Sequence, residues 1–127
     1  MKTTPATTAD LRRSVIAVPP LCRKADLSLS HEENSKLIQH MYAGGIRTLL
    51  YGGNANLYNI APSEYHSLLK MLVEISPEDM WIVPSVGPMY GTAMDQAKIL
   101  SEFAFPTAML LPTLFPSKPE GVATAIR

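Results

Sequence analysis

The chain has 127 residues and 46% of them are apolar, so it is long enough to form one ordinary globular domain with a buried core. Its 11 basic residues balance its 11 acidic residues without any large cluster, which excludes the broad positive field of a nucleic-acid-binding or membrane-surface protein. A single cysteine, Cys22, excludes an internal disulfide framework and an all-cysteine metal site.

Targeting features are also absent from the sequence. No apolar run approaches the roughly 20 residues that a membrane-spanning helix needs. The polar start, Met1–Asp10, lacks the apolar core of a signal peptide, so we expect a cytoplasmic protein. The same segment is rich in threonine and contains Pro5. We therefore interpret residues 1–13 as a loosely structured N-terminal arm.

The first half of the chain then shows two strand patterns and one helix pattern. Residues 14–18 form a short β-prone run that Pro19 closes. Ser30 and Glu33 have the spacing of a capping box and predict a helix that ends at Gly44–Gly45. Residues 48–51 predict a second strand.

The second half repeats this alternation. Pro62 predicts the start of a helix that ends before Ser76, with an apolar face made of Tyr65, Leu68, Leu69, Leu72 and Val73. Residues 81–83 predict a third strand. Thr92 resembles an N-cap for a third helix that buries Ala97, Leu100 and Phe103. Residues 108–111 predict a fourth strand, and Pro119 opens a further helix.

Strands that begin roughly thirty residues apart, each followed by a helix, predict an α/β fold with a parallel sheet. A doubly wound sheet is one possibility, but the turn after the first strand carries no G-x-G-x-x-G phosphate loop. The other is a TIM (β/α)8 barrel, which typically needs about 250 residues. Because the last predicted helix has barely begun at Arg127, we interpret residues 14–127 as the (βα)4 first half of a barrel, truncated from a full one.

The most informative loop follows the second strand. There, an apolar run breaks into Gly52, Gly53 and Asn54. Glycines let the chain turn without a Cβ and bring backbone N–H groups close to a ligand, although glycines after a strand are often simple turn formers. Asn56 and Tyr58 are weaker candidates in the same loop. The three histidines have no metal-binding spacing, so no metal site is expected.

Several segments together resemble the dihydrodipicolinate synthase and N-acetylneuraminate lyase family. Residues 18–21 lie where the family has T-P-F, and residues 45–56, G-I-R-T-L-L-Y-G-G-N-A-N, resemble its G-V-x-G-L-x-x-x-G-T-T-G-E. Residues 60–64 are similar to L-S-x-E-E, residues 82–87 to V-I-A-G-V-G, and residues 112–122 to P-Y-Y-x-K-P-x-x-E-G-L. The resemblance covers nearly the whole chain after the arm.

The resemblance implies a class I aldolase or lyase, in which a lysine forms a Schiff base with pyruvate or a related 2-oxo acid and no cofactor is used. The G-T-T-G-E loop of the family binds the carboxylate, which implies that Gly52, Gly53 and Asn54 bind substrate here. Leu114 replaces the family's proton-relay tyrosine. The Schiff-base lysine of the family lies in the second half of its barrel, so we expect no catalytic residue in this chain.

Two hypotheses follow. In the first, the chain supplies the carboxylate-binding loop of a lyase, while another segment supplies the lysine. In the second, it is a non-catalytic barrel-scaffold protein that binds a small carboxylate or acts in assembly. In either case the open strands at the two edges of a half-barrel lead us to expect a homo-oligomer or a complex with the missing half.

Overall fold

The structure is a computed structural model that describes residues 1–112; the helix expected at Pro119 lies outside this part. The helices are α1 (Thr8–Arg13), α2 (His31–Ala43), α3 (Pro62–Ile75) and α4 (Tyr90–Leu100), with a 3-10 turn, η1 (Leu57–Asn59). The strands are β1 (Ile16–Ala17), β2 (Thr48–Leu50), β3 (Trp81–Val83), β4 (Ser85–Val86) and β5 (Met109–Leu110).

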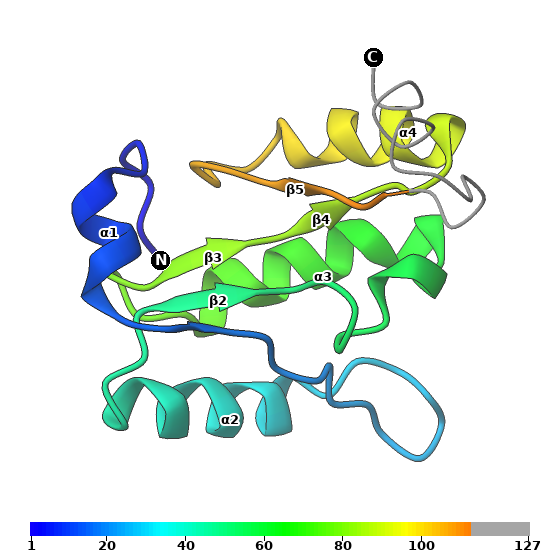
Figure 1. Ribbon diagram of the computed structural model, residues 1–127. Helices are drawn as coiled ribbons and strands as arrows, with labels where there is room; N and C mark the ends of the chain where they lie inside the picture. Colours follow the sequence, from blue (N-terminus) through cyan, green and yellow to red (C-terminus); the bar gives the residue numbers. More distant parts are fainter. Residues whose placement is uncertain (113–127) are drawn as a thin grey trace.

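The strands are parallel. β1, β2 and β3 form one sheet in that order, and Leu49 pairs with Ala17 on one side and Ile82 on the other. β4 continues the chain of β3 after Pro84 and pairs in parallel with β5. In Figure 1 the strands run in one direction, with α2 below them and α4 above. This arrangement confirms an α/β fold with parallel strands.

Side chains alternate between the two faces of the sheet. On the helix-covered face, Leu49 and Ile82 are fully buried in the main core cluster. On the other face, Ile16, Thr48 and Trp81 lie side by side in register, because Thr48 pairs with both of the others. Ile16 remains 48% exposed there. This second face is the one that would line the interior if the sheet closed into a barrel.

Local sequence explains where α2 begins and ends. The Ser30 side chain accepts a hydrogen bond from the backbone N–H of Glu33, as the capping pattern predicted. Gly44 caps the other end, and Gly45 adopts a positive φ of 89°, a conformation that costs glycine little. The chain then turns into β2.

α3 begins at Pro62 as expected, and its buried residues are Tyr65, Leu68, Leu69, Met71, Leu72 and Ile75. The prediction for Val73 was wrong, since this side chain is 37% exposed. α4 starts at Tyr90 rather than after Thr92. It buries Gln96, whose Oε1 accepts a hydrogen bond from the N–H of Gly87, and leaves Ala97 exposed, so the prediction for Ala97 was wrong.

The N-terminal arm is more ordered than the sequence suggested. Thr7 and Asp10 form a reciprocal capping box that starts α1. Ahead of it, the backbone N–H of Lys2 donates to the Met80 carbonyl at 2.8 Å, and the terminal ammonium donates to the Ser76 carbonyl at 3.2 Å. The expectation of a loose arm was wrong. The threonine-rich segment contains a capping pair, and two long-range hydrogen bonds to backbone carbonyls hold its first residues in place.

Candidate functional site

The loop Gly52, Gly53 and Asn54 follows β2 after one residue, Tyr51, at the end of the sheet toward which all the strands point (Figure 1). Gly52 is buried, whereas Gly53 and Asn54 are exposed, so the loop leads from the core to the solvent. The carboxyl ends of parallel strands are where α/β proteins bind small ligands. The position of the loop therefore fits a binding role.

Gly52 has close neighbours on two strands. A Cβ at this position would lie 2.8 Å from Cε of Met109 on β5 and 3.5 Å from Oγ of Ser85 on β4. A Cβ at Gly53 would meet nothing within 4 Å. A side chain at position 52 would therefore require the flexible end of Met109 to move, whereas glycine at position 53 leaves open space above the backbone.

Two backbone hydrogen bonds close the loop. The N–H of Asn56 donates to the Gly53 carbonyl at 2.9 Å, and the N–H of Leu57 donates to the Gly52 carbonyl at 3.2 Å. Leu57 is buried and anchors η1, while Asn56 adopts a left-handed φ of 55°, which asparagine tolerates better than most residues. The turn is thus fixed at both ends.

The side chain of Asn54 links the loop to the neighbouring strand. Its Nδ2 donates to the Val18 carbonyl at 3.0 Å, just beyond β1. An amide carries two N–H groups, so one of them stays available for a ligand. Within residues 1–112, the backbone N–H groups of Gly53 and Asn54 donate to no other residue. The loop carries no charged side chain of its own, and these donors together suit a small anion.

Residues that the sequence did not single out support this end of the sheet. Ser85 Oγ donates to the Tyr51 carbonyl at 2.6 Å, and Tyr65 Oη donates to the Ser85 carbonyl at 2.9 Å. Gln96 Oε1 accepts from the N–H of Gly87 at 2.7 Å, where φ is positive at 96°. The helical spacing of Tyr65 predicted that its side chain is buried. No feature of the sequence indicated the hydrogen-bond partners of the Tyr65, Ser85 and Gln96 side chains.

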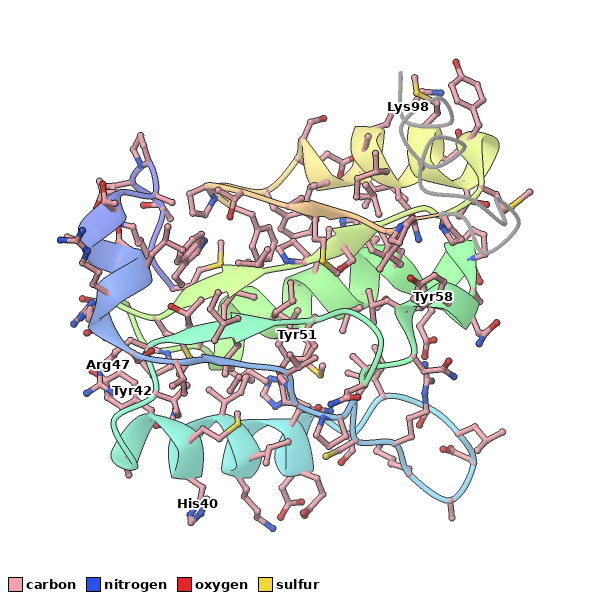
Figure 2. The ribbon with its side chains drawn as sticks, in the orientation of Figure 1. His40, Tyr42, Arg47, Tyr51, Tyr58 and Lys98 are labelled. Atoms are coloured by element: carbon pink, nitrogen blue, oxygen red, sulfur yellow. The ribbon has the colours of Figure 1, made fainter. Side chains whose placement is uncertain are left out.

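Among the described residues, the side chains of the two weaker candidates, Asn56 and Tyr58, make no hydrogen bond to Gly52, Gly53 or Asn54. Tyr90 is 81% exposed at the start of α4. Asn56 Oδ1 accepts from Asn59, a local contact. Figure 2 shows Tyr58 near this end of the molecule, while Tyr42 and Arg47 lie together at the other end, with the guanidinium carbon 3.9 Å from the ring centroid.

The titratable side chains in residues 1–112 do not gather into a metal-binding cluster. No group of three or more His, Cys, Asp or Glu side chains there could hold a metal ion. The hydrogen bonds that Lys36 donates to the Glu32 and Glu33 carboxylates raise the pKa of Lys36, the opposite of what a nucleophilic lysine needs. No helix in the same range combines the length and apolarity needed to cross a membrane. Leu114, at the expected relay position, lies outside the described residues.

No family model and no curated protein matches the sequence. A solved structure does match the fold, that of Sulfolobus sulfataricus 2-keto-3-deoxygluconate (KDG) aldolase in complex with D-KDPG, with a TM-score of 0.70 and 17% identity. The match covers 87% of this chain and 39% of the aldolase chain, so the chain spans less than half of the aldolase. The likeness shows a fold shared with a TIM-barrel aldolase.

Proposed function

We propose that this chain is the (βα)4 first half of an aldolase-type lyase barrel, acting on pyruvate or a related 2-oxo acid through a lysine Schiff base. Gly52, Gly53 and Asn54 bind the carboxylate in this proposal, and a segment outside the chain supplies the lysine. The observation that carries it is the set of backbone and amide N–H groups at the strand ends of a fold shared with an aldolase.

The energetics suit a small anion. Each charge-assisted hydrogen bond from these N–H groups to a carboxylate contributes about 1.5–3 kcal/mol. Two such bonds offset much of the cost of holding a small ligand. The lysine amine then attacks the 2-oxo carbon and water leaves, which forms the imine. Binding of the carboxylate orients the 2-oxo group for that attack.

Borohydride trapping tests the catalytic proposal. The complete protein, containing this chain and the complementary half, is incubated with pyruvate and then with borohydride, which reduces the imine to a stable secondary amine. Mass spectrometry should find the adduct on a lysine beyond residue 127. If no 2-oxo acid in a panel gives an adduct, the catalytic proposal fails.

A second candidate function is a non-catalytic scaffold that binds a small carboxylate. Leu114 favours it, since a leucine at the relay position cannot transfer a proton. Calorimetry separates the two candidates. Binding of a 2-oxo acid that Asn54→Leu abolishes, without turnover, supports the scaffold, whereas measurable turnover by the complete protein eliminates it.

A further inference from the structure

A chain of buried hydrogen bonds runs from α3 to the start of the candidate loop. Tyr65 Oη on α3 donates to the carbonyl of Ser85 at 2.9 Å. Ser85 Oγ in turn donates to the carbonyl of Tyr51 at 2.6 Å. Tyr51, Tyr65 and Ser85 are each at most 1% exposed, so none of these bonds competes with bulk water.

These hydrogen bonds begin where the pairing between β2 and β3 ends. The N–H of Tyr51 donates to the Val83 carbonyl at 2.9 Å, and pairing between β2 and β3 ends with Leu50 and Val83. Pro84 follows, and it has no N–H to donate. The Ser85 hydroxyl therefore supplies the hydrogen bond that the Tyr51 carbonyl receives at the point where the loop begins.

Holding this carbonyl also fixes the next N–H group. The peptide bond between Tyr51 and Gly52 is planar and trans, so its C=O and N–H groups point in opposite directions. With the carbonyl held toward Ser85, the N–H of Gly52 points away from β4. The same restraint sets the direction in which the chain enters Gly53 and Asn54.

We propose that Ser85 and Tyr65 are positioning residues for the loop Gly52, Gly53 and Asn54. Neither residue touches the ligand: Ser85 holds the peptide at the loop entrance, and Tyr65 holds the backbone of Ser85. The effect of these hydrogen bonds on ligand binding rests on the proposed function of the loop, whereas their effect on loop geometry does not.

The chain provides matched controls. Ser76 is another buried serine, and its Oγ bonds to none of the described residues. Ser76→Ala therefore removes a buried hydroxyl without removing a hydrogen bond to any residue among residues 1–112. Tyr42 lies at the other end of the molecule, so Tyr42→Phe removes a tyrosine hydroxyl away from the loop (Figure 2).

Pyruvate titration of the 127-residue chain, followed through the NMR signals of the Gly53 and Asn54 amides, tests the inference. Ser85→Ala and Tyr65→Phe should each weaken binding roughly tenfold, the effect of losing one buried hydrogen bond. Ser76→Ala and Tyr42→Phe should leave the dissociation constant within about twofold of the original. Ser85→Thr keeps the hydroxyl and should restore most of the binding lost in Ser85→Ala. Unchanged binding in Ser85→Ala would overturn the inference.

A second measurement separates this inference from the proposed function. If the unmodified chain binds no 2-oxo acid, the proposed function fails, and the positioning role is judged on the free protein. Amide hydrogen exchange at Tyr51, Asn56 and Leu57, whose N–H groups donate to backbone carbonyls on either side of the loop, should then be faster in Ser85→Ala than in Ser76→Ala by roughly tenfold. Equal exchange rates in the two variants would contradict the positioning role.

Discussion

At the scale of one residue, Gly52 and Gly53 differ in the space that surrounds them. A Cβ at Gly52 would lie 2.8 Å from the end of the Met109 side chain, closer than real contacts allow. Gly52→Ala should destabilise the protein by no more than about 1 kcal/mol, because the flexible end of the Met109 side chain can move aside. Gly53→Ala should change the free energy of unfolding little, since nothing lies within 4 Å of its Cβ position. Urea unfolding measures both.

The cause can be isolated with a double-mutant cycle. Met109→Ala removes the atom that Gly52→Ala would contact, so the two substitutions together should cost less than the sum of their separate effects. A strictly additive result would place the strain somewhere other than the contact between residues 52 and 109. The cycle thus identifies the neighbour that constrains the loop.

Single residues also mark the limit of prediction from sequence. Gly52, Gly53 and Asn54 could be chosen because glycine after an apolar run has a known backbone consequence. Ser85 and Tyr65 could not, because their roles depend on strand register and on how α3 packs on the sheet. Asn54 lies between these cases: its N–H groups were expected to face a ligand, and one of them binds Val18 instead.

At the scale of one element, Asn34 ties α2 to the loop after β1. Its Nδ2 donates to the carbonyls of Cys22 and Ser30 at 2.8 and 2.7 Å, and its Oδ1 accepts from the N–H of Cys22 at 3.0 Å. Because the side chain is fully buried, Asn34→Ala should cost about 2–3 kcal/mol. Asn59→Ala, which removes an exposed amide, is the matched control, and an equal loss in both variants would contradict this account.

α1 should respond to acid. Hydrogen bonds from the Thr7 side chain and backbone lower the pKa of Asp10. A lowered pKa in the folded state stabilises the helix start above the ordinary carboxyl value and loses that effect as the pH falls through the folded pKa. NMR signals of residues 8–13 should therefore shift toward coil values below about pH 4.

A variant checks that Asp10 causes this change. Asp10→Asn should loosen α1 at neutral pH and remove its response to acid, because the uncharged side chain accepts more weakly from Thr7. Asp95→Asn, on exposed α4, should leave α1 unchanged. Signals of residues 8–13 that stay constant from pH 6 to pH 3 would show that the capping box does not depend on the charge.

Elements with strong periodicity or clear end signals were predictable. α2 and α3 have caps and apolar faces in the sequence, and β3 coincides with its predicted range of residues 81–83. α1 was missed because its signal is the spacing of Thr7 and Asp10 within a threonine-rich segment. The β4 extension was missed because Pro84 interrupts the run of apolar residues, although the chain resumes pairing with β5 immediately afterwards.

At the scale of the whole molecule, the described strands leave two edges. β1 pairs only with β2, and β5 only with β4, among residues 1–112. The alternation of strand and helix was enough to predict parallel strands, but closure of a sheet depends on which strands meet at its edges, and local sequence does not encode that contact. The half-barrel proposed here therefore makes its own prediction about association.

If the chain is a half-barrel, it should associate through these edges when isolated. Light scattering should show a dimer or larger species, because parallel edges with unpaired N–H and C=O groups recruit another strand. Ile16→Lys adds a charge on β1 and should shift the chain toward monomer, whereas Leu27→Lys, in an exposed loop, should not. A well-folded monomer for the unmodified chain, or equal effects of the two lysine substitutions, would contradict association through β1. When the complementary half of the barrel is added, it should compete with self-association of the chain.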